Sequence, residues 1–163
     1  PTPYFGEYST NHGVLVFTKL MIDVYGPDDE MEWVEISNIS IYDFNLSGSS
    51  IKSDDCSWEL VVFPENTVIP AMGSIIVGGP ISNEYNLDPV FDYSVALYPG
   101  LGNSGDTLCI KDSAGNVHDL ITYNRSWYEG SGNMIHFCGG FYDENLPEDA
   151  MHNDSSDNWC IWE

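Results

Sequence analysis

The chain has 163 residues, of which 42% are hydrophobic and 13% aromatic, a length and composition that suit one domain with a core of its own. Its 26 Asp and Glu residues against 4 Lys and Arg give a formal net charge of −22, and a surface of this sign repels phosphate backbones, which argues against nucleic acid as a partner. No apolar run approaches the roughly 18–20 residues that cross a bilayer, so the sequence predicts no membrane span.

The N-terminal residues 1–13 contain Pro, Gly and Tyr without a clear period, so we predict an extended arm. Three apolar side chains in the arm, Tyr4, Phe5 and Tyr8, gain little from exposure to water. We expect them to fold back on their own domain or to dock on a neighbouring molecule. Residues 14–163 are predicted to form one domain.

Turn residues divide that domain into short segments rich in β-branched and aromatic residues, and no long stretch has a helical period. We therefore predict an all-β fold of about eight to ten short strands with negligible helix. The segment 43–51 contains Ser-Gly-Ser-Ser and is predicted as a turn or bulge. Strands are expected over 14–24, 31–38, 58–63, 74–77, 90–97, 106–112, 117–123, 134–138 and 158–162. Such a pattern is typical of an antiparallel β-sandwich.

The clearest local signal is a hairpin in which residues 106–112 and 117–123 flank the turn Ser-Ala-Gly-Asn. Gly115 in that turn can adopt the positive φ that a bulge-type hairpin needs. Alternation along the strands predicts a one-sided buried face. The expected core comprises Leu15, Phe17, Val34, Ile36, Leu60, Val62, Ile75, Val77, Leu108, Ile110, Leu120 and Tyr123.

Five segments follow one another in a recognisable order: EWVEISN (32–38), FNLSG (44–48), FPENTVIPAMGSIIV (63–77), GDTLCIKDSAGNVHDLITY (105–123) and SSDNW (155–159). In this order and spacing they resemble the lamin tail domain family, which also occurs as a module of exported bacterial and archaeal proteins. The resemblance covers residues 14–159. It implies an immunoglobulin-like β-sandwich and a non-catalytic module. It names no partner, because partners vary between members of the family.

The four cysteines form no C-x-x-C pair, so disulfides are favoured over a zinc knuckle. Cys138 ends one predicted strand and Cys160 lies in the last, and pairing of those strands would bring the two sulfurs within bonding distance. Cys56 and Cys109 are then left for each other. Four cysteines permit three connectivities, of which this is one.

Four N-x-[ST] sequons begin at Asn38, Asn45, Asn124 and Asn153. Together with the cysteines they favour an exported glycoprotein, extracellular or at the cell surface. Either its signal peptide has been removed or the chain is an excised piece of a longer protein.

Acidic residues cluster in two loops, at Asp28, Asp29 and Glu30 and again at Asp143 and Glu144. Oxygen ligands on loops suit Ca²⁺, which makes these residues candidate calcium ligands. The sequence contains no D-x-[DN]-x-[DN]-G loop, so a solvated acidic surface is the main alternative. Adaptation to strong salt or to a mineral-rich matrix is another.

No catalytic signature is visible, since the four His are scattered and no nucleophile motif or P-loop occurs. The Gly-rich segment 100–106 leads into a strand rather than a helix, so it is not a phosphate-binding loop. The sequence therefore predicts no enzyme. The five Trp suggest carbohydrate binding, but aromatic residues of a β-sandwich more often belong to the core, so this is a minor alternative. We expect Trp33 and Trp58 in the core and Trp127 and Trp162 at the surface.

The main functional hypothesis is a secreted or cell-surface module for adhesion, anchoring or assembly, with a protein partner or a second copy of the chain. One alternative is a subunit of an extracellular filament or matrix, linked by residues 1–13. Another is an accessory domain of an extracellular hydrolase of the nuclease or phosphatase type. Exposed strand edges are a route to association. At this net charge, association is expected to strengthen with salt or Ca²⁺ and to weaken when residues 1–13 are removed.

Overall fold

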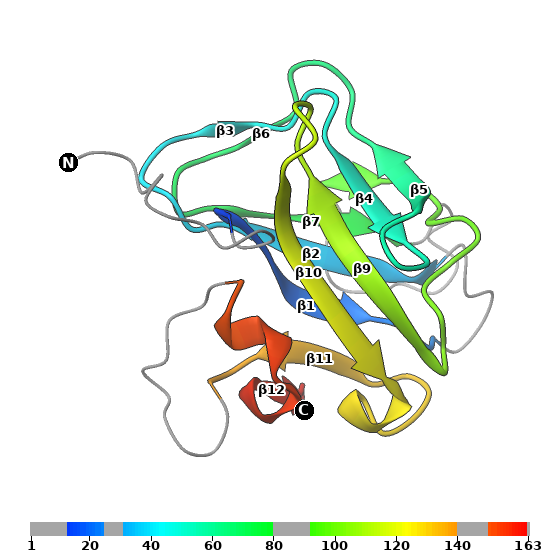
Figure 1. The fold of residues 1–163 in the computed structure, drawn as a ribbon. Helices are drawn as coiled ribbons and strands as arrows, with labels where there is room; N and C mark the ends of the chain where they lie inside the picture. Colours follow the sequence, from blue (N-terminus) through cyan, green and yellow to red (C-terminus); the bar gives the residue numbers. More distant parts are fainter. Residues whose placement is uncertain (1–12, 25–30, 80–91, 140–149, 163) are drawn as a thin grey trace.

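A computed structural model of the chain describes residues 13–24, 31–79, 92–139 and 150–162. Strands dominate these residues and form two facing sheets, as Figure 1 shows. All neighbouring strands are antiparallel except β7 and β8. The predicted all-β sandwich is therefore confirmed.

The six-stranded sheet has the order β12-β11-β1-β2-β7-β8 and the four-stranded sheet the order β10-β9-β4-β5, and β3 and β6 form a small third sheet. The first sheet contains β12 (Trp159–Ile161), β11 (Met134–Phe137), β1 (Leu15–Met21), β2 (Trp33–Asn38), β7 (Ser74–Gly78) and β8 (Tyr93–Ser94). The others contain β10 (Val117–Asn124), β9 (Gly105–Lys111), β4 (Ser50–Ser53), β5 (Trp58–Val62), β3 (Phe44–Asn45) and β6 (Val68–Ile69). The 3-10 helices η2 (Arg125–Trp127), η3 (His152–Asp154) and η4 (Ser156–Asn158) have three residues each.

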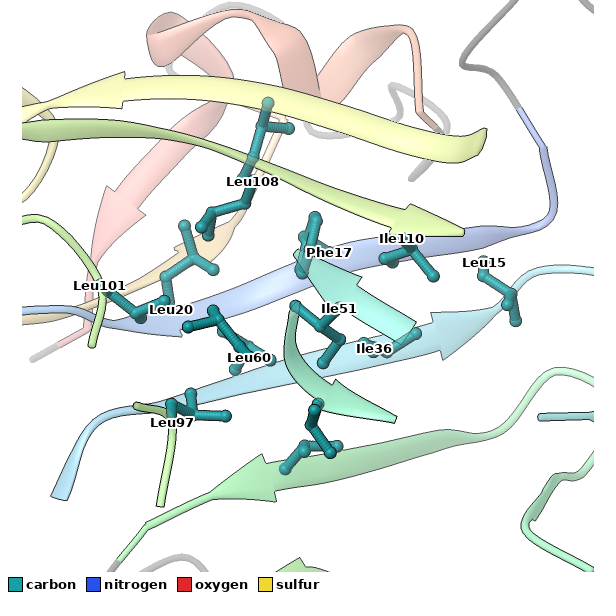
Figure 2. Packing of buried hydrophobic residues seen from close by; sticks show 14 of the residues in the cluster. Leu15, Phe17, Leu20, Ile36, Ile51, Leu60, Leu97, Leu101, Leu108 and Ile110 are labelled. Carbon is teal, nitrogen blue, oxygen red and sulfur yellow. The ribbon is translucent and has the colours of Figure 1, made fainter. Parts of the chain in front are cut away.

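The core lies between the two large sheets. Figure 2 shows Phe17 and Ile36 of the six-stranded sheet packed with Ile51 of the four-stranded sheet. Burying these apolar faces against each other is the main source of stability in a sandwich. Ten of the twelve predicted core residues are buried: Leu15, Phe17, Val34, Ile36, Leu60, Ile75, Val77, Leu108, Ile110 and Tyr123.

The two wrong core predictions are Val62 and Leu120. Val62 is 48% exposed, and Val61 is buried in its place. The pairing of β4 with β5 shifts register between Ile51 and Lys52, so the two-residue alternation breaks there. In β10 the buried residues after the bulge at its start are Asp119, Ile121 and Tyr123, which leaves Leu120 on the outer side.

The hairpin prediction is confirmed. Gly115 has φ of 87°, and its N–H donates to the Asp112 carbonyl at 3.0 Å. Oδ1 of Asp112 accepts from the N–H groups of Ala114 and Asn116, which closes the turn between β9 and β10.

The turn predicted within 43–51 is present at Gly48, and β3 and the start of β4 lie on either side of it. One strand prediction needs correction. The predicted strand over 90–97 is reduced to the two residues of β8 within the described part of the chain. Apart from Gly13, the predicted arm lies outside the described residues.

Both predicted disulfides are present. Cys56 pairs with Cys109, with 5.5 Å between the Cα atoms, and Cys138 pairs with Cys160, with 5.9 Å. The first ties the β4–β5 turn to β9, and the second joins Cys138, directly after β11, to Cys160 in the neighbouring strand β12. All four cysteines of the chain are therefore oxidised.

Candidate functional site

A surface pocket of about 490 Å³ opens at the end of the sandwich where β4 ends and β5 and β9 begin. We call it the Trp58 pocket. Its walls come from the β4–β5 turn and from the loop that leads into β9. It is lined by Ser53, Asp54, Trp58, Tyr98, Pro99, Gly100, Leu101, Gly102, Gly105 and Asp106.

Two large aromatic side chains at the pocket are exposed, Trp58 at 51% and Tyr98 at 65%. The indole Nε1 of Trp58 donates a 3.2 Å hydrogen bond to the Tyr98 carbonyl, which orients the indole against the loop. The prediction of a core position for Trp58 is wrong, because Trp58 is the first residue of β5, an edge strand. Exposed aromatic area of this kind is typical of a binding surface.

The turn that carries Asp54 is unusually tight. Asp54, Asp55 and Cys56 all have left-handed backbones, with φ of 51°, 55° and 62°. Consecutive non-glycine residues rarely adopt this conformation, so other contacts must hold it. The disulfide to the buried Cys109 is one such contact.

The Asp106 carboxylate joins the two walls of the pocket. Its Oδ1 accepts from the N–H of Asp54 at 2.9 Å and of Thr107 at 2.7 Å, and its Oδ2 accepts from the N–H of Gly102 at 3.2 Å. A carboxylate with several backbone donors is held firmly. Asp106 therefore positions the turn against the loop.

The loop wall is anchored from beneath by buried side chains. Oε2 of Glu32 accepts from the Leu101 N–H at 2.6 Å. The Tyr123 hydroxyl donates to the Gly102 carbonyl at 2.8 Å, and the Tyr128 hydroxyl donates to the Asn103 carbonyl. Burial raises the pKa of Tyr123 far above its ordinary value, so its hydroxyl remains a donor at any physiological pH.

Glycine is required at one point of this wall. Gly100 has φ of 112°, and a Cβ there would lie 3.0 Å from Oε2 of Glu32. The absent side chain lets the backbone approach the buried carboxylate. The loop wall of the pocket is therefore preformed, because buried side chains hold its backbone in place.

The charges at the pocket have one sign. Its lining includes Asp54 and Asp106 and no Lys or Arg. Three of the chain's four basic side chains lie in ion pairs: Lys19 with Glu35 at 3.4 Å, Lys52 with Glu59 at 4.0 Å and Arg125 with Asp23 at 3.5 Å. The pocket is therefore an acidic, aromatic-lined hollow in a strongly acidic protein.

Sequence reasoning missed this site because its residues come from two segments that meet only in the fold. One signal is present in the sequence, since the Gly-rich segment 100–106 closely follows the aromatic Tyr98. That combination indicates a loop bordered by an aromatic side chain. The register of Trp58 at a strand start cannot be read from alternation alone.

Two of the four predicted glycosylation sites have buried side chains. Asn38 is 1% exposed, and its Nδ2 donates to the carbonyls of Tyr42, Ile69 and Pro70. Asn153 is 1% exposed, and its Nδ2 donates to the Phe17 carbonyl and to Asp119. A glycan bonded to either nitrogen is incompatible with these contacts.

The other two sequons are accessible. Asn45 and Asn124 are exposed, and each uses Oδ1 to accept from the residue two positions later, Ser47 and Ser126 respectively. In both, Nδ2 is the atom left for a glycan.

The predicted calcium ligands Asp28, Asp29, Glu30, Asp143 and Glu144 lie outside the described residues, as do Tyr4, Phe5 and Tyr8 of the predicted arm. In the part of the chain that is described, no group of three or more His, Cys, Asp or Glu is placed to hold a metal ion. No helix in that part is long and apolar enough to cross a membrane.

The pair most like an acid–base dyad is His118 with Asp112. Nε2 of His118 lies 2.9 Å from Oδ2 of Asp112, and its Nδ1 accepts from the Val14 N–H at 3.1 Å. Burial raises the pKa of Asp112, but hydrogen bonds from His118 and Asn116 outweigh it, so the net pKa is lowered. With both ring nitrogens engaged, His118 fixes the start of β1 against the hairpin.

The remaining tryptophans follow the sequence expectations in part. Trp33 is buried and Trp162 is 54% exposed, whereas Trp127 is half-buried and packs against the core cluster.

The chain matches no family model and no curated protein sequence.

Proposed function

We propose that the chain is a non-catalytic interaction module of a secreted or cell-surface protein, and that the Trp58 pocket is its recognition site. One observation carries the proposal: two exposed aromatic side chains, Trp58 and Tyr98, border a hollow whose walls are fixed by buried anchors. Keeping such area in water has no benefit for folding. A preformed hollow with aromatic walls and a few polar groups is the usual form of a ligand site.

The disulfides support an extracellular location. The Cys56–Cys109 and Cys138–Cys160 bonds use every cysteine of the chain. Such bonds persist in oxidising compartments and are rare in the cytosol. The acidic surface adds solubility and resistance to self-association.

The lamin-tail resemblance is part of the same proposal. The segment EWVEISN corresponds to β2, and the long segment 105–123 corresponds to β9 and most of β10. β2 lies inside the six-stranded sheet and β9 inside the four-stranded sheet, whereas β10 is an edge strand. The chemistry of the described residues supports a non-catalytic role, since the four cysteines are oxidised and His118 has both ring nitrogens engaged.

The test is a ligand screen followed by nuclear magnetic resonance on the ¹⁵N-labelled protein. The panel contains neutral sugars, organic cations, and short basic and acidic peptides. We expect at least one class to shift the amide signals of the pocket residues, and the double variant Trp58→Ala/Tyr98→Ala to abolish those shifts. Trp162→Ala is the matched control, because Trp162 is equally exposed but lies elsewhere.

A panel in which no class perturbs the pocket amides overturns the proposed recognition site. Shifts confined to other surfaces overturn it as well.

A further inference from the structure

We propose that the Trp58 pocket binds an organic cation, namely an alkylammonium or guanidinium group. This inference rests on the proposed function, because it names the ligand class of the same pocket. The cation belongs either to a free small molecule or to a Lys or Arg side chain of a partner, and the recognition chemistry is shared by both sources.

Five N–H donors at the pocket are already in use. The N–H of Asp54 and that of Gly102 donate to Asp106, and the N–H of Leu101 donates to Glu32. The N–H of Gly105 donates to the Gly102 carbonyl, and the indole N–H of Trp58 donates to Tyr98. A sugar hydroxyl needs both donors and acceptors from its site. A ligand that only donates needs acceptors alone, so it does not depend on the five N–H groups that are occupied.

The exposed anionic acceptor of the pocket is the Asp54 carboxylate. Asp54 is exposed, and its Oδ2 lies 3.5 Å from the Ser57 hydroxyl, at the long limit of a hydrogen bond. Asp106 has a different role, because three backbone N–H groups occupy its two oxygens. Asp54 is therefore the group that would contact the cation, and Asp106 is a positioning residue.

The aromatic walls suit the same ligand. A cation over the face of Trp or Tyr is attracted by the ring quadrupole, and Trp gives the strongest attraction. The same protein shows such a contact elsewhere, since Nζ of Lys19 lies 5.2 Å from the centroid of the Trp162 ring. The lining of the Trp58 pocket contains no Lys or Arg, so none of its own side chains supplies a cation to the Trp58 ring.

The charge of the whole chain acts in the same direction. A net charge of −22 raises the local concentration of cations, and a hollow lined by carboxylates focuses that field. A neutral sugar gains nothing from it. The field also predicts that binding weakens as salt increases.

The experiment titrates the ¹⁵N-labelled protein with choline and with its neutral carbon isostere, 3,3-dimethylbutan-1-ol. We expect choline to shift the amide signals of residues 54, 58, 98–102 and 106, and the isostere to bind about tenfold more weakly or not at all. Methylguanidinium is expected to shift the same signals. Raising the salt from low to about 0.5 M should weaken both cations and leave the isostere unchanged.

Variants separate the two recognition elements. Asp54→Asn keeps the shape and suits the left-handed backbone at position 54, so its fold should be intact and its affinity for choline reduced about tenfold. Trp58→Phe keeps a ring of lower attraction and should weaken binding less than Trp58→Ala. Trp162→Ala, outside the pocket, should bind choline as the wild type does.

The source of the cation is read from a third arm, in which N-acetyl-lysine amide and N-acetyl-arginine amide are compared with choline. Tighter binding of either amide points to a side chain of a partner, and tighter choline binding points to a free small molecule. Equal affinity for choline and its isostere overturns the inference. If methyl glucoside binds at the pocket and no cation does, the inference is overturned but the proposed recognition site is retained. If no probe shifts the amide signals of the pocket, both are overturned.

Discussion

The Asn153 side chain donates a 2.7 Å hydrogen bond from Nδ2 to Oδ2 of Asp119, and both side chains are buried. The same Oδ2 accepts from the Phe17 N–H at 2.8 Å, and Nδ2 of Asn153 also donates to the Phe17 carbonyl at 3.0 Å. Asp119 lies in β10 and Phe17 in β1, so this network joins the two large sheets through η3. The network lies next to the bulge in β1, where the register of the pairing with β2 shifts between Phe17 and Lys19.

Removing the amide should be costly. Asn153→Ala leaves the Phe17 carbonyl and Asp119 short of a donor, and such a loss in a buried site destabilises by about 1–3 kcal/mol. Urea unfolding of the variant measures it. Ser156→Ala, at an exposed position of η4, is the control and should change the free energy of unfolding by less than about 0.5 kcal/mol. Equal effects of the two changes would contradict the structural role of Asn153.

The Asp119 carboxyl predicts a pH dependence. Burial raises the pKa of Asp119 well above its ordinary value, although bonds from Phe17 and Asn153 act in the opposite direction. The folded state then binds the proton more tightly than the unfolded state, whose pKa is about 3.9. Stability from this group is complete below that pH and is lost as the pH rises towards the folded pKa.

Asp119→Asn removes this titrating group. The free energy of unfolding of the variant, relative to that of the wild type, should therefore increase as the pH rises from about 4 to about 7. Unfolding in urea at both values gives the comparison. Asp157→Asn removes one exposed carboxylate and controls for the change in net charge. A wild-type-minus-variant difference that does not change with pH would refute the prediction for Asp119.

Glycan occupancy should divide the four sequons. In folded protein secreted by a glycosylating cell line, we expect glycans at Asn45 or Asn124 and none at Asn38 or Asn153, whose Nδ2 atoms are buried donors. Peptide mapping after enzymatic deglycosylation in heavy-oxygen water identifies the occupied positions. A glycan at Asn38 in the folded fraction would be inconsistent with this packing.

The two disulfides should differ in their effect on the Trp58 pocket. Their sequence separations are 53 and 22 residues, so the chain-entropy model gives stabilisations of about 4 and about 3 kcal/mol. Cys56→Ala/Cys109→Ala frees the turn that carries Asp54 and should weaken ligand binding as well as stability. Cys138→Ala/Cys160→Ala should lower stability alone. Equal binding by both double variants would show that the turn keeps its form without the bond.

The hairpin turn offers a clean test of backbone conformation. Gly115 has a positive φ, and a Cβ added there would have no other atom within 4 Å, so Gly115→Ala meets only the backbone penalty, about 1 kcal/mol. Gly115→Asn should cost less, because Asn tolerates this conformation. Thermal unfolding ranks the three proteins, and an order with Ala above Asn would contradict the argument.

Much of the sandwich could be predicted from the sequence, because turn residues separate short segments rich in β-branched and aromatic residues. The hairpin, with its Gly115 turn, depends on local signals that a short window contains. The pairing of Cys138 with Cys160 follows from the neighbouring strands that carry them. Strands of two residues, such as β3, are fixed by partners distant in sequence and leave no period to detect.

The two errors in the predicted core arise from details of strand pairing. Bulges in β1, in the β4–β5 pair and in β10 change which side of the sheet a residue faces, and their positions depend on the partner strand. The bulge in the β4–β5 pair displaces Val62 from the core. Leu120 lies three residues from the buried Tyr123, so the regular alternation after the bulge in β10 places it on the outer face. The same dependence on distant partners explains why the Trp58 pocket, built from two separate segments, could not be predicted from local pattern.

The ion pairs formed by three of the four basic side chains have a consequence for how the molecule behaves as a polyelectrolyte. With those cations engaged internally, the excess carboxylates must be accompanied in solution by a diffuse atmosphere of mobile cations. A basic ligand that docks on such a surface displaces part of that atmosphere into the bulk. The entropy of the released ions then contributes to binding, in the way that counterion release drives basic proteins onto an anionic polymer.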